Sequence, residues 1–483
     1  MNTIMNSVPA VWSIAGHDPF SGAGISADLR VAAALWQPLR TIIASFTAQN
    51  DQTFFAAEAN SVHWLDQQWK ALASAETPAA YKVGLLLNPE SVRFIADHVK
   101  PGIPLILDPV LGSSSGRSFV SSDLLSSMRD YLFRATSLLT PNRPEAEIIS
   151  GIKIDSEDDL KTAAAIIRSQ GVAAVLIKGG HAEGDTLVDY FDDGKKPFFL
   201  STKRLPGSFR GTGCALSTAI ASYIAKGEEL RDAVVAGHSY VQTAIAISFR
   251  EGSNHLLSFG QTPHLSDLYY SAKPEGKFAP MPRAIGFYPV LPNVEWIERF
   301  AKSGVQTVQL RVKGESEATL RQSILRAKEV CEANDILLFV NDAWQLAIEY
   351  GAFGVHLGQE DLDLLNEDDL KKIRDSGLRL GISTHSLEES ARAKTLGPSY
   401  IALGPVFETT CKSMRFGPQG IARVGEWVKR LPQIPIVAIG GLKLDHAPEV
   451  LAEGADSIAV ISNLTEAPEP EQRMNDWLKV FSR

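Results

Sequence analysis

The sequence predicts an α/β protein with two domains: a three-layer domain with helices on both faces of a sheet, then a (β/α)8 barrel. Three observations support this prediction. The 483 residues are too many for one core. Short apolar runs alternate with amphipathic stretches along the whole chain, and eight such units follow one another in the last part. Between the two parts, residues 271–282 hold three prolines and a glycine without apolar periodicity. We therefore expect a first domain at 1–270, a linker at 271–282 and a second domain at 283–483.

The first domain is predicted from short apolar runs that are interrupted by segments with helical periodicity. The expected strands are 11–15, 41–46, 80–83, 105–107, 137–139, 174–178 and 186–191. The expected helices are 24–35, 62–75, 89–99, 143–150, 157–170 and 215–225. Such alternation predicts a parallel sheet with helices on both faces.

The second domain repeats the same unit more evenly. Its expected strands are 284–288, 307–310, 337–340, 354–357, 379–382, 400–403, 436–439 and 457–460, and a last helix covers 470–481. A doubly wound sheet is the alternative, but eight evenly spaced strands favour closure into a barrel. Polar motifs also stand just after the strands, where barrel active sites lie.

Composition excludes several classes of function. A net charge of −9 without a basic tract argues against a nucleic-acid binder, so any phosphate ligand must meet local positive charge. Three distant cysteines give no disulfide framework. No apolar run reaches membrane-spanning length, and the N-terminus lacks an export signal. We expect a cytoplasmic enzyme with small-molecule partners, no nucleic-acid or membrane partner, and a homo-oligomer left open.

The segment 208–220, Ser-Phe-Arg-Gly-Thr-Gly-Cys-Ala-Leu-Ser-Thr-Ala-Ile, carries the densest chemical information. Gly211, Thr212 and Gly213 open a predicted helix, and backbone N–H groups at a helix N-terminus form a cradle for an anion. Cys214 lies in that cradle, where the helix dipole should lower the pKa of its thiol. An anion site beside a potential base indicates phosphoryl transfer; the alternative is a glycine-rich turn into a buried helix.

Further polar residues follow the other predicted strands of the first domain. A glycine-rich loop at 15–28 follows the first strand, and Gln49, after the second, offers a donor and an acceptor to a heteroaromatic ring. Asp108 could bind Mg²⁺, as could Asn142 and Glu145 directly or through its waters. Lys178 can meet a phosphate as a point charge. Each is an ordinary turn or strand end by itself, but their joint occurrence favours a site.

Together these motifs resemble the hydroxymethylpyrimidine/phosphomethylpyrimidine kinases of thiamine biosynthesis, a family with the ribokinase fold, over residues 11–265. The resemblance implies ATP as co-substrate and Cys214 as general base. It implies that the aminopyrimidine is held by Gln49 and by backbone near Gly16, Ala23 and Asp28, with Leu85 and Val110 lining its face. It also implies that Lys178 and Thr212 serve the ATP phosphates.

The second domain carries polar residues at the ends of seven consecutive predicted strands. Gln309, Arg311 and Lys313 share one face of an extended segment and offer positive charge to a polyphosphate. Asp342 and Asp361, on neighbouring strands, form a natural pair of Mg²⁺ ligands. The other polar motifs are Asn341, Ser383, a loop at 404–412, and the segments 438–441 and 460–462.

This pattern is similar to thiamine-phosphate synthase over residues 285–479. The resemblance implies condensation of an aminopyrimidine diphosphate with hydroxyethylthiazole phosphate. It implies that Gln309, Arg311, Lys313, Asn341 and Lys412 bind the diphosphate, with Asp342 and Asp361 on Mg²⁺ and Ser383 and Thr409 assisting. Gly441, Ile461 and Ser462 would bind the thiazole phosphate. Cys411 stands where the family usually has threonine. The alternatives are a barrel like the thiazole tautomerases, or one that senses a ligand without turnover.

Overall fold

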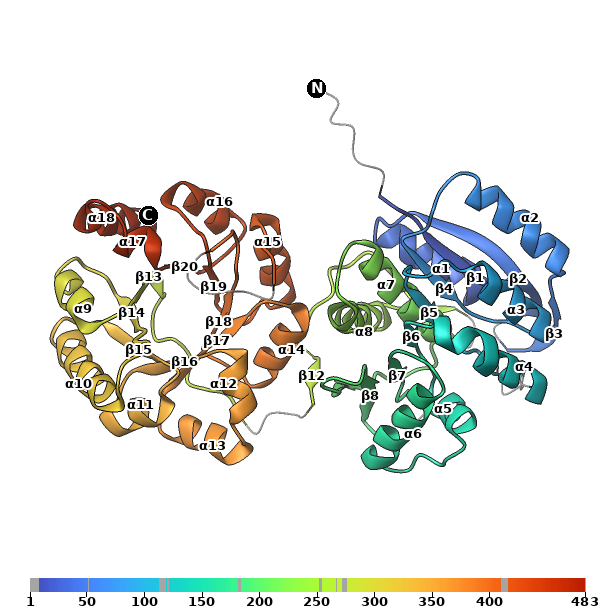
Figure 1. Cartoon of the computed structure of the whole chain (residues 1–483), viewed down its shortest axis with the longest axis horizontal. Helices are drawn as coiled ribbons and strands as arrows, with labels where there is room; N and C mark the ends of the chain where they lie inside the picture. Colours follow the sequence, from blue (N-terminus) through green and yellow to red (C-terminus); the bar gives the residue numbers. More distant parts are fainter. Residues whose placement is uncertain are drawn as a thin grey trace, which may run out of the picture. The chain divides into compact units, whose positions relative to one another are not determined.

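The computed structural model describes residues 8–50, 52–112, 119, 121–180, 184–251, 254–265, 267–271, 276–409 and 416–482. The chain divides into two compact units (Figure 1). The first comprises residues 1–263 and 267–272, and the second residues 264–266 and 273–483. Phe278, from the expected linker, is buried and donates its N–H to the carbonyl of Gly397 at 2.9 Å. The end of that segment therefore packs on the second unit.

The first unit is built on a ten-stranded sheet with the order β12-β9-β8-β7-β6-β5-β4-β1-β2-β3. The strands are β1 (Val11–His17), β2 (Leu39–Gln49), β3 (Phe54–Ala59), β4 (Ala80–Val83), β5 (Leu105–Leu107), β6 (Leu138–Leu139), β7 (Val175–Ile177), β8 (Thr186–Asp192), β9 (Phe198–Lys203) and β12 (Tyr269–Tyr270). A separate pair joins β10 (Phe249–Glu251) to β11 (Asn254–Leu256).

The central strands of this sheet run parallel, as predicted, but its edges do not. β3 pairs antiparallel with β2, and β8, β9 and β12 continue the other edge antiparallel. The expectation of a parallel sheet is therefore wrong at both edges. β2–β3 and β8–β9 are hairpin neighbours, and chain reversal through a short loop makes antiparallel pairing the direct solution.

Helices cover both faces of the sheet. One layer holds α2 (Val62–Ala73), α3 (Pro89–His98), α4 (Ser122–Ser127), η1 (Met128–Leu132), η2 (Phe133–Ala135), α5 (Arg143–Ser150) and α6 (Glu157–Ser169). The other holds α1 (Gly24–Ala34), α7 (Thr212–Ala225) and α8 (Leu230–Ala246). Because side chains alternate along a strand, Trp12 and Tyr81 enter the core under the first layer, while Ser13 and Lys82 face α1 and α7.

The second unit is a closed barrel of eight parallel strands, as predicted (Figure 1). The strands are β13 (Gly286–Leu291), β14 (Thr307–Leu310), β15 (Leu337–Asn341), β16 (Gly354–Leu357), β17 (Arg379–Thr384), β18 (Tyr400–Leu403), β19 (Ile436–Ile439) and β20 (Ser457–Val460). Around them lie α9 (Val294–Phe300), α10 (Glu317–Ala333), α11 (Trp344–Tyr350), α12 (Gln359–Leu364), α13 (Glu367–Asp375), α14 (Leu387–Thr395), α15 (Ile421–Arg430), η3 (Leu444–His446), α16 (Ala447–Ala452), α17 (Ser462–Thr465) and α18 (Pro470–Phe481).

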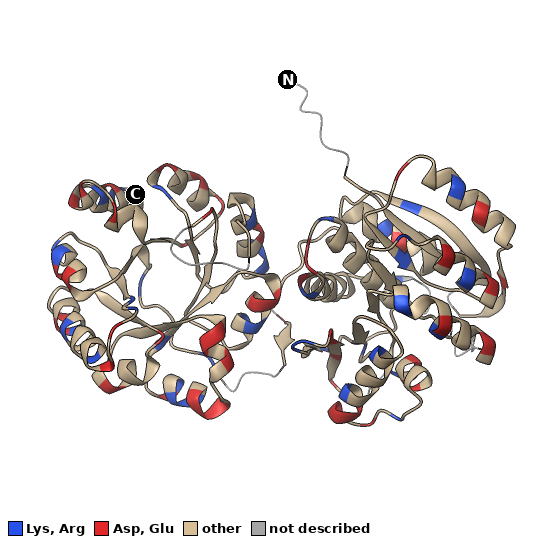
Figure 2. Cartoon of the chain, viewed as in Figure 1, with Lys and Arg blue, Asp and Glu red and all other residues tan. Residues whose placement is uncertain are grey.

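Charge is distributed over the helices of both units. In the view of Figure 2, Lys and Arg alternate with Asp and Glu along the helices, whereas the barrel strands are almost free of either. Amphipathic helices around a buried sheet produce this distribution, because their polar faces stay in water. The local positive charge needed by a phosphate ligand must then come from particular residues at the strand ends.

Candidate active sites

The carboxyl ends of β5, β6 and β7 bring three predicted residues together in the first unit. Asp108 follows β5, Asn142 follows β6 and Lys178 follows β7, and these strands are neighbours in the sheet. The Lys178 ammonium lies 2.8 Å from Oδ1 of Asp108, and Thr140 donates to the same oxygen at 3.3 Å. Asn142 and Lys178 also form a parallel β-bridge. Val110 donates its N–H to the carbonyl of Asp108, so Val110 lies at the same edge of the sheet.

The N-terminus of α7 faces this edge. A Cβ on Gly213 would lie 3.1 Å from Nζ of Lys178 and 3.4 Å from the carboxylate of Asp108. Gly211 has a φ of 74°, and a Cβ there would lie 2.1 Å from the carbonyl oxygen of Gly22. Only glycine satisfies both conditions at position 211. Thr212 begins α7 and remains partly exposed. Lys178 and Asp108 therefore lie beside the glycine-rich N-terminus of α7, and its role as an anion cradle stays a prediction.

The glycine loop after β1 closes the other side of the cradle. Gly24 has a φ of 57°, and a Cβ there would lie 2.1 Å from the carbonyl oxygen of Gly16. A Cβ on Gly16 would in turn lie 3.2 Å from Leu85. Asp18 folds the loop by accepting N–H groups from Gly22 and Ala23. These glycines thus permit close approach of one backbone segment to another: Gly16 lies next to Gly24 and Leu85, and Ala23 lies next to Gly211 at the start of α7.

The thiol of Cys214 does not have the predicted acidity. Burial raises its pKa to about 11, and the charges of Asp28 and Asp108 add to the rise. Lys82 and the backbone N–H of Gly24 act in the opposite direction without compensating. The prediction of a lowered pKa is therefore wrong, because desolvation and two carboxylates outweigh the helix N-terminus. Cys214 is a protonated thiol at neutral pH in this structure.

Asp28 and Lys82 form a fully buried ion pair below the site. The Lys82 ammonium lies 2.8 and 3.1 Å from the two carboxylate oxygens, and both side chains have 0% exposure. Ser13 and Thr218 also donate to Asp28, at 2.6 and 2.7 Å. Its carboxylate is thus engaged internally, and the predicted contact near Asp28 with a pyrimidine stays a prediction. Lys82 belongs to no recognisable motif, so the sequence analysis did not identify it.

Gln49 is held by a residue that sequence reasoning also missed. Arg210 donates to Oε1 of Gln49 at 2.8 Å and to the carbonyl of Asn50, and lies 3.8 Å from Asp18. The Gln49 amide nitrogen donates to Thr47 at 3.0 Å. Arg210 therefore connects the glycine loop, the end of β2 and the segment before α7. Its position directly before Gly211 is the one signal that could have drawn attention to it.

Asn142 and Glu145 form a capping box at the start of α5. Glu145 accepts the N–H of Asn142 at 2.8 Å, and its own N–H bonds the Asn142 side chain at 2.9 Å. The other Glu145 oxygen accepts the N–H of Leu111 at 3.3 Å. Burial raises the pKa of Glu145 to about 7, while Lys178 lowers it and Asp108 raises it further. Their role toward phosphate or Mg²⁺ stays a prediction.

In the barrel, Asp342 is the centre of a charged group at the strand ends. It follows β15 with a φ of 62° and binds the Lys313 ammonium through its carboxylate. Asp361 accepts the N–H of Gly358 at 2.8 Å. Burial and the neighbouring Asp342 raise the pKa of Asp361. Two adjacent carboxylates that repel one another fit a Mg²⁺ ion, which binds one or two carboxylates and completes its shell with phosphate and water. Clusters of three or more His, Cys, Asp or Glu suited to a metal are absent from the described part of the chain.

A chain of hydrogen bonds crosses the barrel interior and ends at Ser383. Gln309 on β14 and Ser383 on β17 are its two ends, and both are predicted diphosphate contacts. Between them lie Tyr288, Tyr400 and His356, all buried. Burial lowers the pKa of His356 to about 4. Arg311 and His385 lower it as well, whereas Asp342 raises it. Its imidazole is therefore neutral at physiological pH. Arg311 and Asn341 stand at the ends of β14 and β15, beside this chain.

The last predicted residues lie at the ends of β18, β19 and β20. Gly441 has a φ of 64°, and a Cβ there would lie 2.3 Å from the carbonyl of Glu408, next to Thr409. Ile461 is the N-cap of α17, and Ser462 is its first residue. β19 and β20 are adjacent, so these residues share one rim of the barrel. Lys412 and Cys411 lie outside the described residues.

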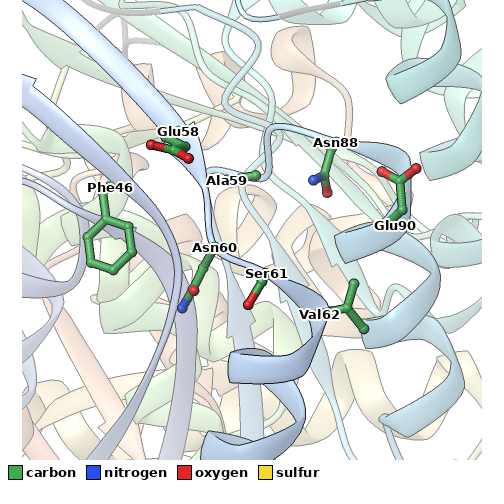
Figure 3. A pocket seen from close by; sticks show the side chains of 8 residues that line it. All are labelled: Phe46, Glu58, Ala59, Asn60, Ser61, Val62, Asn88 and Glu90. Atoms are coloured by element: carbon green, nitrogen blue, oxygen red, sulfur yellow. The ribbon is translucent and has the colours of Figure 1, made fainter.

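A surface hollow of about 490 Å³ lies on the first unit (Figure 3). It is lined by Phe46, Glu58, Ala59, Asn60, Ser61, Val62, Asn88 and Glu90. It contains none of the predicted site residues, so we place neither activity there. None of the helices in the described part of the chain is long and apolar enough to span a membrane.

The first unit thus has the three-layer fold of a small-molecule kinase, with Lys178 and the N-terminus of α7 at one edge of its sheet. The second has the fold of a TIM-barrel enzyme, with charged side chains at its strand ends. Comparisons with known proteins agree. Residues 18–258 match the family model of phosphomethylpyrimidine kinase, and residues 289–464 that of thiamine monophosphate synthase. The chain belongs to the thiamine-phosphate synthase family through its barrel, and its first unit is a phosphomethylpyrimidine kinase domain. It is a bifunctional enzyme of thiamine biosynthesis.

Individual proteins that match each half are as follows. Thiamine-phosphate synthase from Yersinia pestis is 48% identical over 199 residues, which are 41% of this chain and 88% of the relative. Staphylococcus aureus pyridoxal kinase, solved with AMP-PCP and pyridoxal, is 25% identical with a TM-score of 0.50 and covers 54% of this chain and 97% of its own. A phosphomethylpyrimidine kinase from Clostridium difficile is 34% identical with a TM-score of 0.44, and the match covers 49% of this chain and 99% of that kinase. The synthase relative disfavours the tautomerase and sensor alternatives.

Proposed function

We propose that the two units act in series on one aminopyrimidine. The first transfers phosphoryl groups from ATP to hydroxymethylpyrimidine and then to its monophosphate. The second joins the resulting diphosphate to hydroxyethylthiazole phosphate, giving thiamine phosphate and diphosphate. The observation that carries the proposal is the presence of Lys178 beside the glycine-rich N-terminus of α7 in one unit, together with a carboxylate pair beside Lys313 in the other.

In the kinase, Lys178 and the backbone around Gly211, Thr212 and Gly213 would hold the ATP phosphates. An acceptor oxygen forms a bond to the γ-phosphorus as the bond to the β–γ bridging oxygen breaks, and ADP leaves. Lys178 stabilises the charge that gathers on the leaving phosphate. Gln49 would bind the pyrimidine edge through its carbonyl and amide. The backbone near Gly16, Ala23 and Asp28 would also hold the ring, and Leu85 and Val110 would line its face.

Cys214 would accept a proton only in the first transfer. There the acceptor is an alcohol, which must lose its proton, whereas a phosphate monoester is already ionised at pH 7. The pKa of about 11 means that a thiolate is rare before substrates bind. Once formed, however, such a thiolate is a strong base. The two half-reactions therefore make different demands on the same residue.

In the synthase, cationic and polar side chains would hold the diphosphate as it departs. These are Gln309, Arg311, Lys313, Asn341, Ser383, Thr409 and Lys412. The carbon–oxygen bond to the pyrimidine methylene breaks, the ring amine stabilises the cation, and the thiazole nitrogen forms the new carbon–nitrogen bond. Asp342 and Asp361 would hold Mg²⁺, which supplies positive charge for the leaving group when bound. Asp108, near Asn142 and Glu145, would serve a Mg²⁺ that accompanies ATP.

The thiazole phosphate would bind at the rim formed by Gly441, Ile461 and Ser462. Positive-φ glycines expose backbone N–H groups, and barrels commonly bind phosphate after the seventh and eighth strands. This rim adjoins β13, the first strand of the barrel. Both substrates would therefore reach the same opening of the barrel. A cytoplasmic location stays a prediction, and homo-oligomer formation stays open.

The test supplies the full chain with hydroxymethylpyrimidine, Mg-ATP and hydroxyethylthiazole phosphate. We expect thiamine phosphate to form. Asp342→Asn should stop thiamine phosphate formation and let the pyrimidine diphosphate accumulate. Lys178→Met should remove the diphosphate itself, and adding that diphosphate should restore product. Failure of this rescue, or loss of both activities in Asp342→Asn, would contradict the division of labour.

A further inference from the structure

The geometry of the hydrogen-bond chain inside the barrel determines which group donates and which accepts at each step. Gln309 Nε2 lies 3.2 Å from the Tyr288 hydroxyl, which lies 2.8 Å from the Tyr400 hydroxyl. Tyr400 lies 2.7 Å from Nδ1 of His356, and Nε2 of His356 lies 2.8 Å from the Ser383 hydroxyl. Four of the five side chains are buried, with exposures of 0 to 6%. Each missing hydrogen bond in such a place is costly.

One arrangement of the hydrogens satisfies every buried member. The amide nitrogen of Gln309 can only donate, so Tyr288 accepts from it. Tyr288 then places its single hydrogen on Tyr400, and Tyr400 places its own on Nδ1 of His356. The reverse order would leave the Tyr288 hydroxyl hydrogen without an acceptor along this chain. Because Nδ1 of His356 accepts the Tyr400 hydrogen in this order, it carries none of its own, and the ring hydrogen lies on Nε2, which is 2.8 Å from the Ser383 hydroxyl.

We propose that Tyr400 is a positioning residue for the synthase: through His356 it holds Ser383 as an acceptor toward the barrel interior, which leaves the Ser383 hydroxyl hydrogen free to donate to the substrate. This inference rests on the proposed synthase function of the barrel. Ser383 sits at the end of β17, and its backbone carbonyl accepts a hydrogen bond from Gln359 at 2.8 Å. Its side chain is the one member of the chain that is partly exposed.

The chain offers a matched pair of substitutions. Tyr400→Phe removes the donor to His356, so the imidazole can turn to its other tautomer and take the Ser383 hydrogen. Tyr288→Phe removes an equally buried hydroxyl but leaves Tyr400 able to donate to His356. We expect kcat/KM for the pyrimidine diphosphate to fall about tenfold in Tyr400→Phe and no more than about threefold in Tyr288→Phe. Equal losses, or a larger loss in Tyr288→Phe, would overturn the proposal.

A double-substitution cycle distinguishes this role from general support of the fold. Ser383→Ala should lower kcat/KM about tenfold or more, because a hydrogen bond to a charged group is lost. If Tyr400 acts through Ser383, Tyr400→Phe should cause little further loss in the Ser383→Ala background. Multiplication of the two losses would show that Tyr400 acts elsewhere and would contradict the proposal.

Nitrogen-15 spectra of histidine-labelled full-length protein test the direction of the chain without any turnover. The His356 signals, assigned with His356→Gln, should show a protonated Nε2 and an unprotonated Nδ1, and Tyr400→Phe should change them. A protonated Nδ1 in the unsubstituted protein would overturn the proposal. If the chain made no thiamine phosphate, the proposed synthase function would fail, and the spectra would still decide whether this hydrogen-bond order exists.

Discussion

Lys82 and Asp28 pair beneath the kinase site at 2.8 Å, with neither side chain reaching solvent. Burial alone would lower the pKa of Lys82, but the charges of Asp28 and Asp108, and that of the Cys214 thiolate once it forms at high pH, raise it above its usual range. The pair joins β4 to α1, and Thr218 joins α7 to the same carboxylate. The helix that carries Cys214 is thus attached to the sheet through charged groups.

The first prediction concerns the stability of this pair. Lys82→Met should destabilise the first unit by about 3–5 kcal/mol, because it leaves the Asp28 charge buried without a partner. Adding Asp28→Asn should recover a substantial part of that loss, since no uncompensated charge remains. The measurement is the urea concentration that halves kinase activity, with synthase activity of the same chain as internal control. A double variant as unstable as Lys82→Met would contradict this explanation.

The second prediction concerns the reactivity of Cys214. With a pKa of about 11, the thiol should have a thiolate fraction at pH 8 about a hundredfold below that of a thiol with a pKa of 9. Its alkylation by iodoacetamide, followed by peptide mass spectrometry, should stay slow at pH 8 and rise up to pH 10. A rate that levels off below pH 8 would show that the helix N-terminus controls the thiol after all.

The third prediction separates the two phosphoryl transfers. Cys214→Ala should lower kcat for the alcohol substrate by about a hundredfold, within the usual range for loss of a general base. For the monophosphate substrate the loss should be less than about tenfold, because no proton must be removed. The same preparation should be tested with both acceptors at saturating ATP. Equal losses would indicate that Cys214 shapes the site and does not move a proton.

The fourth prediction concerns Arg210. Because it donates to Oε1 of Gln49, it fixes which end of that amide is the acceptor. Arg210→Met should raise KM for the pyrimidine about tenfold with less than about threefold change in KM for ATP, as expected for one hydrogen bond to a charged group. Arg210→Lys should lie between, since one ammonium cannot reproduce the paired contacts to Gln49 and Asn50. A rise confined to ATP would place Arg210 in the phosphate site.

The sequence predicts the barrel well because its strands are short apolar runs between turns. Residues 307–310, 354–357, 400–403, 436–439 and 457–460 form strands with the predicted bounds. The prediction from sequence fails where apolar periodicity is weak. The helix α8 was missed because it is buried on most of its surface and lacks a polar face that would mark it as a helix. The hairpin strands β3 and β9 were missed because each follows its partner after only a short turn.

The candidate sites show the same contrast. Strand-end motifs led to Asp108, Lys178, Asp342 and Asp361, because parallel strands end at a common edge. Lys82, Arg210, Tyr288 and Tyr400 lack motifs, and their partners lie far away in the sequence. The acidity of Cys214 was predicted with the wrong sign, because a helix N-terminus can be read from local sequence whereas burial and distant carboxylates cannot.

The fifth prediction concerns Glu145. Its pKa is raised from 4.5 to about 7, mainly by burial, so the folded chain binds a proton in this range that the unfolded chain has released. The free energy of unfolding should therefore decrease as pH rises from 4.5 to 7. Glu145→Gln removes the charge but leaves the N–H of Asn142 or of Leu111 without its acceptor, at a cost that does not depend on pH. Its stability relative to the unsubstituted protein should therefore rise between pH 5 and pH 8, by on the order of 2 kcal/mol. Urea inactivation of the kinase at several pH values measures this difference, with Glu90→Gln as an exposed control. A constant difference across that range would show that Glu145 is ionised in the folded protein throughout, held so by Lys178.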